Sequence, residues 1–545
     1  MRRIKESILR GMTKTDWELL VFLLLVMNVK LWVKLLAIVF IYFRRPDFSF
    51  TNSLKQFSIP LFYPAMILIA IIDLLLFSLY KEQNYLPLFI TGIFFWVGCI
   101  LIVHQLLLVF RYSDPEKIHN ALFLFFLINV LASCVNLGLI VREIHQVNPY
   151  TYQGMHQKYF IGTGDYIKGI SFDTSTTNAM LNAFGIVYFL SRKQFVMTLL
   201  CMAVLLLTCS NFTNLLVLAC LAYFFIFKTD RDQKSIIVVQ LIMLVVFMAN
   251  VSPQNNKYAI KVIERTAGHG QLNQKNTPEE KIIPIAERPD SVLSTEEKKY
   301  KTAKKYLDSV ATIRAAENID KNHGTLTIKP IIPTVNIHAP EYQHVPDSSE
   351  ARMQAVRLLR TIQERNKTMG SDTIAVNSQV PGKIQAFKQL ARFMQAHPSK
   401  IVTGDGMGNF SSKLAFRATG LQIAGSYPSS LWYIHEDFKQ NHLTVYLDYF
   451  ARDSGYHSVT HSPNSVYAQL LGEYGIAGIL AFVAGYLFYF SKRILTTASG
   501  VPLLLLMLGA FITDYWFEQL SIVILFELLI ILNRQEIPKT KSANL

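Results

Sequence analysis

The chain has 545 residues, of which 51% are hydrophobic and only 17% charged, and its mean hydropathy is +0.28. These proportions are too apolar for a soluble protein of this length, so we expect a lipid bilayer to be its solvent. The net charge of +15 does not indicate nucleic-acid binding. The Lys and Arg residues fall largely in short clusters between apolar runs, which is typical of topology signals.

The first apolar stretch, 17–43, is long for one helix and carries Lys30 and Lys34 near its middle. Basic residues precede it and Arg44 and Arg45 follow it, and positive residues beside a span mark the cytoplasmic side. Because both ends then lie on one side, we expect two short helices hinged near residues 28–30. The stretch lacks a small-residue cleavage site, which predicts a retained membrane segment and not a removed signal peptide.

Further apolar runs have the length that a bilayer requires, about 17 to 25 residues. They occupy 58–80, 86–110, 119–141, 211–228, 465–490 and 515–533, with shorter runs at 177–190, 194–210, 236–252 and 499–513. Together they predict an all-α polytopic membrane protein with about twelve transmembrane helices and both termini in the cytoplasm. The loop 142–176 then lies outside.

A long polar stretch predicts a large, mainly helical periplasmic insert between the ninth and tenth transmembrane helices. The predicted divisions are an N-terminal membrane region of about nine helices, 1–252, a periplasmic loop domain, 253–462, and a C-terminal membrane region of three helices, 463–545. Helices are expected within the insert from about Ser294, from about Asp347, and from Pro381 to His397. The last has Ile384, Phe387, Leu390 and Met394 on one predicted face. All five cysteines lie in apolar segments, so disulfides do not hold the insert.

Two short motifs near the outer face are candidates for chemistry. His461 comes just before the apolar helix that contains Glu473, and a histidine there can take a proton from an attacking hydroxyl near neutral pH. The alternative is a solvated loop residue, with Asn464 or a neighbour capping the helix. The run from Gly404 to Phe410 includes Gly406 and Gly408, and its amides could cradle an anion or simply form a tight turn.

Charged residues complete the set of candidates. Arg142, Lys383 and Arg417 are expected to face outward, where cations suit a pyrophosphate, although most such charges are simply solvated. Inside the membrane, charged side chains are costly unless they face protein or a water-filled cavity. The ones predicted there, which suggest a polar cavity, are Asp73, His104, Glu473, Asp514, Glu518 and Glu527.

The order and spacing of these motifs resemble the O-antigen ligase and polymerase family, whose members are membrane glycosyltransferases that use polyprenyl-pyrophosphate-linked glycans. Pro381–Phe387, an amphipathic helix and then Gly404–Phe410 resemble the family's outer loop of Gly-Arg, helix and Gly-x-Gly-x-Gly-x-Phe. His461–Asn464, followed by a helix with Glu473, Gly475 and Gly478, is similar to its His-Asn helix ending in Glu-x-Gly-x-x-Gly. The matching features span about 170–530.

The resemblance implies a bacterial inner-membrane enzyme that transfers a glycan, with inversion, from polyprenyl pyrophosphate to an acceptor hydroxyl on a glycan, lipid or protein. It implies no cofactor, no metal and no nucleic-acid partner. His461 would be the catalytic base and Lys383 would stand where an Arg is usual. The other substrate-binding residues would be Arg142, Arg417, Asn464, Glu473, Gly406 and Gly408.

The chain departs from the family pattern at three positions. Lys383 lacks the bidentate fork of an Arg, Asn211 replaces an Arg, and Pro463 occupies the place of the usual His. Either His461 reaches the same point or His457 or another histidine substitutes. A polymerase of the same family, a transporter and a non-catalytic assembly partner remain alternatives to a ligase, although the two related halves common in transporters are not evident.

Overall fold

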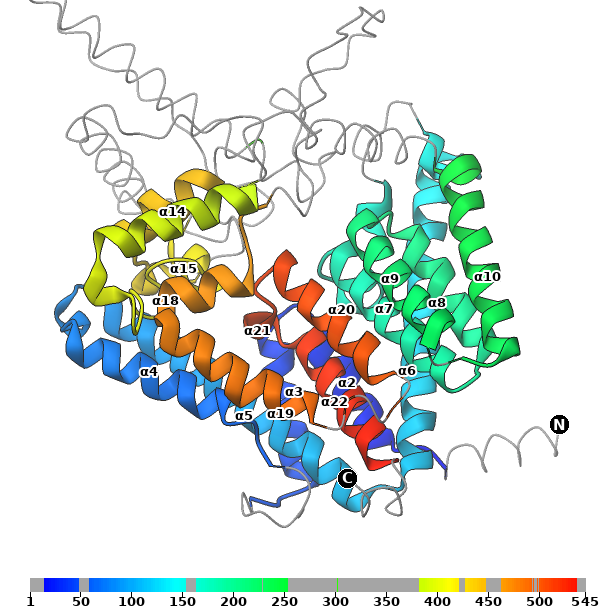
Figure 1. Cartoon of the computed structure of the whole chain (residues 1–545), viewed down its shortest axis with the longest axis horizontal. Coiled ribbons are helices and arrows are strands. Elements are labelled where there is room, and N and C mark those ends of the chain that lie inside the picture. The colour runs from blue at the N-terminus through cyan, green and yellow to red at the C-terminus, as the bar shows by residue number, and fades with distance from the viewer. Residues whose placement is uncertain are drawn as a thin grey trace, which may run out of the picture.

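A computed structural model describes residues 14–48, 58–152, 163–227, 229–252, 301, 382–420, 427–446, 462–492, 494, 497 and 499–536. All regular structure in these ranges is helical, and they contain no strand. Figure 1 shows the helices of the first half on both sides of the last helices, with α14 and α15 above α4 and α18. The chain therefore has the predicted all-α architecture over its described part.

The first apolar stretch forms a helical hairpin. It consists of α2 (Trp17–Met27) and α3 (Leu31–Arg44), which pack against each other. The Arg45 guanidinium bonds to Asp16 at 3.1 Å and to Glu18 at 2.6 Å, so the start of α2 and the end of α3 lie side by side. The predicted hinge near residues 28–30 is confirmed.

The two lysines of the hairpin take different positions. Lys30 is exposed in the turn, whereas Lys34 is only 4% exposed. The ammonium of Lys34 donates to the carbonyl oxygen of Val26 at 2.6 Å, which satisfies an otherwise unpaired acceptor at the end of α2. The N–H of Val29 donates to the carbonyl oxygen of Ser171 at 3.0 Å, so the hairpin tip contacts the predicted outer loop.

The other predicted apolar runs coincide with helices. In the first half these are α4 (Phe62–Leu76), α5 (Tyr85–Tyr112), α6 (Pro115–Ile144), α7 (Ser175–Ser191), α8 (Phe195–Leu207), α9 (Asn211–Phe227) and α10 (Arg231–Val246). In the second half, α18 (Val466–Ala481) continues through a π-helical turn into α19 (Phe488–Ser491), and α20 (Gly500–Thr513) follows. The run predicted at 515–533 is divided into α21 (Trp516–Gln519) and α22 (Ser521–Gln535) because Leu520 has φ 66°.

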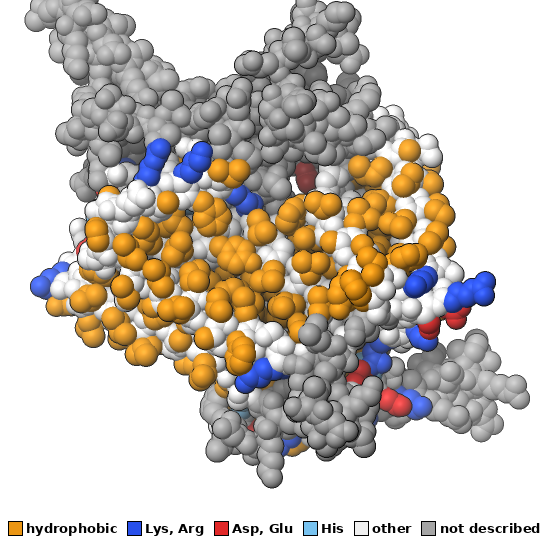
Figure 2. All heavy atoms as spheres, viewed as in Figure 1, with side chains coloured by type: hydrophobic (Ala, Val, Ile, Leu, Met, Phe, Trp, Pro, Cys, Tyr) orange, Lys and Arg blue, Asp and Glu red, His pale blue; other side chains and the backbone are white. Residues whose placement is uncertain are grey.

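Several of these helices could cross a membrane. Four stretches in the described part are long and apolar enough, Tyr85–Tyr112, Pro115–Ile144, Arg231–Val251 and Val466–Ser491, and five shorter helices are also apolar. Figure 2 shows a broad apolar band across one face, with Lys and Arg side chains along its upper and lower edges. Such a band is expected where lipid tails contact the protein and basic side chains reach the interface.

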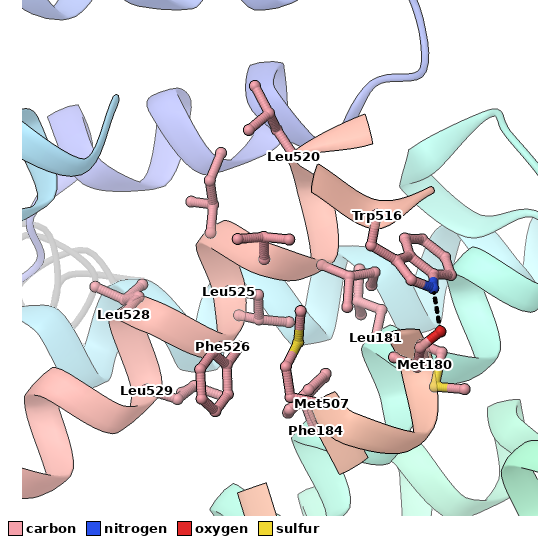
Figure 3. Packing of buried hydrophobic residues seen from close by; sticks show 14 of the residues in the cluster. Met180, Leu181, Phe184, Met507, Trp516, Leu520, Leu525, Phe526, Leu528 and Leu529 are labelled. Atoms are coloured by element: carbon pink, nitrogen blue, oxygen red, sulfur yellow. Dashed lines mark hydrogen bonds between the residues drawn. The ribbon is translucent and has the colours of Figure 1, made fainter. Parts of the chain in front are cut away.

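The core lies where the last helices enter the bundle of the first half. Trp516 in α21 packs beside Met180, Leu181 and Phe184 of α7, with Met507 of α20 close by (Figure 3). The Trp516 indole N–H donates to the carbonyl oxygen of Ala510 at 2.7 Å, so its polar atom is satisfied. This packing holds the break between α20 and α22 in one conformation.

Three short helices of the predicted insert are described. They are α14 (Gly382–Ala396), α15 (Lys413–Ala418) and α16 (Glu436–Phe438), and α16 continues into a π-helical turn, Lys439–Leu443. The predicted helix 381–397 is confirmed as α14, whereas those predicted near Ser294 and Asp347 lie outside the described residues.

The predicted apolar face of α14 is buried only in part. Leu390 is buried and Met394 packs against the same small core, but Ile384 and Phe387 are 47% and 39% exposed. The buried side also includes Lys383, whose ammonium bonds to the start of the α18 segment.

Candidate functional site

The helix that follows the insert is broken at Gly475. This residue has φ 61° and ψ −157°, a conformation that in practice only glycine adopts. The break leaves backbone N–H groups of α18 without their usual helical acceptors, and carbonyl groups of the predicted insert accept hydrogen bonds from them. Ile476 N and Ala477 N donate to the carbonyl oxygens of Ile401 and Val402, at 2.9 and 2.8 Å.

The glycine-rich turn completes this junction. Gly404, Gly406 and Gly408 all have positive φ, between 82° and 93°, so the tight turn predicted from the sequence is confirmed. The N–H of Gly406 donates to the carbonyl oxygen of Glu473 at 3.2 Å. The amide of Gly406 therefore holds α18 in this structure and is not directed at an anion, whereas a substrate role for Gly408 stays a prediction.

Glu473 is fully buried at the same junction. Its Oε1 accepts the N–H of Ser411 at 3.1 Å, and the N–H of Gly408 and the hydroxyl of Ser412 also interact with the carboxylate. In this structure Glu473 orders the insert loop and its contacts are with the protein itself.

His442 is the centre of a buried polar cluster. Its Nε2 lies 2.7 Å from the hydroxyl of Tyr515 and 3.3 Å from the hydroxyl of Ser411, and those two hydroxyls are 3.0 Å apart. Only 1% of His442 is exposed. The three side chains come from the π-helical turn after α16, the break before α21 and the end of the glycine-rich turn.

Asn464 and Lys383 extend the cluster to the mouth of α18. The Tyr515 hydroxyl also lies 3.3 Å from Oδ1 of Asn464, and the Lys383 ammonium donates to the Asn464 carbonyl oxygen at 2.6 Å. We call His442, Tyr515, Ser411, Asn464 and Lys383 the His442 cluster. It joins five separate segments of the chain, so its geometry is fixed by tertiary contacts.

Burial sets the protonation of His442 and Lys383. It lowers the pKa of His442 to about 3, and the Lys383 charge acts in the same direction, against a hydrogen bond with Asn464. Burial also lowers the pKa of Lys383 to about 7, with Asp514 opposing the change. His442 is therefore neutral at physiological pH and keeps a lone pair that can accept a proton.

The His442 pKa predicts loss of stability in acid. The unfolded chain binds a proton on this histidine near its ordinary pKa of about 6.5, while the folded chain binds it only near about 3. Stability therefore falls as pH decreases from about 6.5 to about 3, by about 1 kcal/mol between pH 7 and pH 5.5. Melting curves of the detergent-purified protein against pH measure this, and His442→Gln is expected to flatten the profile. An equally steep profile in the variant would assign the titration to other groups.

A cation-lined pocket lies between the hairpin tip, α15 and α21. Its cavity volume is about 10 Å³, which is room for about one water molecule. Its charged lining residues are Lys34, Lys413, Arg417, Asp173 and Glu518. Glu518 Oε2 accepts the N–H of Leu414 at 2.7 Å and its Oε1 accepts from Gln469, which fixes the carboxylate. The pocket and the His442 cluster share the α21 segment, since Tyr515 and Glu518 lie three residues apart.

The structure brings only part of the predicted site together. Lys383 and Asn464 join the His442 cluster, Glu473 lies behind it against Ser411, and Arg417 lines the pocket. Arg142 is exposed in the last turn of α6 and takes no part in the described contacts of the cluster. The predicted base, His461, and its alternative His457 lie outside the described residues, so their roles stay predictions.

Sequence reasoning missed His442, Tyr515 and Ser411. No motif surrounds His442, and Tyr515 was included in the apolar run 515–533. The one available signal was Pro463, which stands where the family usually has its histidine. Its presence implied that another histidine could act in that place.

Comparisons of the chain with protein-family models, with curated proteins and with solved structures found no match.

Proposed function

We propose that the chain is a membrane glycosyltransferase of the O-antigen ligase type. It would transfer a glycan from polyprenyl pyrophosphate to an acceptor hydroxyl, on a lipid A-core or a similar molecule, at the periplasmic face of the bacterial inner membrane. The observation that carries the proposal is a buried His442 bonded to Tyr515, which precedes the α21 segment that lines the cation-lined pocket. The cluster also contains Asn464, just before the helix whose motifs resemble that family.

The proposed topology has about twelve crossings with both termini in the cytoplasm. It places the insert, and with it the His442 cluster, on the periplasmic side. The hairpin supports this arrangement, because Arg45 at its end pairs with Asp16 at its start and its tip contacts the segment 163–174, which belongs to the predicted outer loop.

The proposed reaction is a direct displacement. The acceptor hydroxyl replaces the hydrogen bond of Tyr515 and gives its proton to Nε2 of His442 as its oxygen attacks the anomeric carbon. The bond from that carbon to the pyrophosphate oxygen breaks, and the leaving group departs as an anion. Lys34, Lys413 and Arg417 would stabilise the developing charge in the pocket, without a metal or a nucleotide cofactor.

Lys383 acts on the base in this scheme. Its ammonium is bound to the Asn464 carbonyl. Burial is the main cause that lowers the pKa of His442 and keeps the imidazole unprotonated before the acceptor binds, and the charge of Lys383 adds to this effect. Asn464 and Tyr515 orient the ring. The cluster thus combines a proton acceptor with its orienting groups, as proton transfer in a group-transfer enzyme requires.

The surface glycans of cells that lack this chain test the proposal. Lipid-linked ladders are expected to vanish while polyprenyl-linked chains persist, and the native chain is expected to restore the ladders. A collapse of long chains to single repeats would instead assign a polymerase of the same family. An unchanged profile in cells that make such glycans would contradict both assignments.

A substitution of Arg417 tests the role of the pocket separately. Arg417→Met keeps the length of the side chain and removes the charge, so ladder formation is expected to fall by about tenfold or more. Arg142→Met is the matched control, because Arg142 is exposed and lies apart from the described contacts. Equal loss in both variants would show that the pocket is not the site of the pyrophosphate.

A further inference from the structure

A second polar cluster lies where the glycine-rich turn meets α16. It contains Asp405, His435 and Asp437, whose potential metal-binding atoms all lie within 4.8 Å of one another. Asp405 belongs to the turn that holds the broken helix, and His435 is the residue that caps the start of α16. This second cluster shares no residue with the His442 cluster or with the lining of the cation-lined pocket.

The donor atoms converge on one point. His435 Nδ1 lies 3.3 Å from Oδ2 of Asp405 and 3.7 Å from Oδ2 of Asp437. Asp405 is only 1% exposed, and in the described part of the chain its Oδ2 has only the imidazole of His435 as a donor, at a long 3.3 Å. A buried carboxylate oxygen that is so weakly bonded is costly, and a cation at this point would satisfy it.

The charges around this point also favour a cation. Lys400 pairs with Asp405 and with Asp437, and Glu82 lies 4.0 Å from Nε2 of His435. One ammonium therefore faces three carboxylates. The three carboxylates outnumber the ammonium and the imidazole together, so the group carries an excess of negative charge that a divalent ion would balance.

We propose that Asp405, His435 and Asp437 bind a divalent transition-metal ion such as Zn²⁺. Imidazole nitrogen and carboxylate oxygen are both donors that this class of ion accepts, with a fourth position left for water. Nδ1 of His435 would exchange the N–H of Asp437, which it accepts at 3.2 Å, for the ion. When no ion is bound, the ammonium of Lys400 supplies the positive charge at the site. The Lys400 side chain is flexible and 19% of it is exposed, so its ammonium can move into solvent when the ion enters.

The ion would have a structural role. It ties the glycine-rich turn to the start of α16, and the π-helical turn that continues α16 carries His442. The site thus goes beyond the proposed transfer reaction, in which the ion takes no part.

Titration of the full-length protein with ZnCl₂ tests the site. The protein is purified in detergent with a tag that lacks histidine, treated with a chelator and followed by calorimetry. We expect one saturable binding event. His435→Ala is expected to weaken it by more than about tenfold, since loss of even a second-shell partner costs that much. His397→Ala is the matched control, because His397 is exposed on the same insert and lies outside the cluster.

Lys400→Met separates the proposal from a general loss of structure. It keeps all three ligands and removes the competing ammonium, so zinc affinity is expected to rise by about tenfold, the reverse of the His435→Ala effect. Lower affinity in Lys400→Met, or unchanged affinity in a folded His435→Ala protein, would overturn the site. Absence of saturable binding to the native chain would do the same.

Discussion

Cells whose only copy of the chain carries His442→Gln are expected to lose the transfer product by about 10²- to 10⁴-fold, the usual contribution of a general base. Glutamine can still hydrogen-bond to Tyr515 and Ser411, so the packing of the cluster is kept while the proton acceptor is removed. The quantity of lipid-linked glycan, measured against the amount of inserted protein, checks this expectation.

Two further histidine variants make the His442 test specific. His397→Gln changes an exposed histidine of the same insert and is expected to keep full activity. His461→Ala tests the base predicted from the family resemblance. Full activity in a stable His442→Gln protein, with loss in His461→Ala, would move the base to His461 and leave the proposed reaction intact.

Replacing Gly475 by alanine is expected to prevent accumulation of folded protein. A Cβ at this position would lie 2.5 Å from the carbonyl oxygen of Val402, and the φ of +61° is strained for any residue with a side chain. The backbone strain alone costs about 1 to 3 kcal/mol, and the steric conflict adds to it. Yield of monodisperse protein and its melting temperature measure the effect.

Gly138→Ala is the control for the Gly475 substitution. Gly138 lies within α6, and a Cβ there would meet nothing within 4 Å. Alanine also favours a helix more than glycine, by about 1 kcal/mol, so unchanged or higher stability is expected. Native yield and melting temperature for Gly475→Ala would mean that the α18 segment does not require the broken conformation.

The sequence predicted those parts of the fold that depend on local properties. Apolar runs became helices because their length and composition suffice to define them. The hinge of the first hairpin was predicted from the basic residues at its two ends. In the structure the two ends are joined by the ion pairs of Arg45 with Asp16 and Glu18. The helix now labelled α14 was likewise predicted within one residue at each end.

The sequence did not predict features that depend on distant partners. The break at Gly475 is stabilised by carbonyl groups of Ile401 and Val402, more than 70 residues earlier, and nothing local requires it. The role of His442 likewise arises only when Tyr515 and Ser411 come from other segments. The apolar spacing of α14 predicted its buried side only in part, and Lys383, a residue expected at the surface, is bound inside the protein.

The junction at Gly475 has a consequence for how the protein matures during synthesis. The glycine-rich turn bonds to α18, which is made later, and its Met407 carbonyl accepts the hydroxyl of Tyr85 in α5, which is made much earlier, at 3.0 Å. Under the proposed topology the turn is exported before α18 leaves the ribosome. The final helices therefore cannot reach their native conformation until the exported segment has folded and returned to the membrane surface. Assembly of the last helices would thus be coupled to translocation, with export of the insert as the step that precedes and permits closure of the bundle.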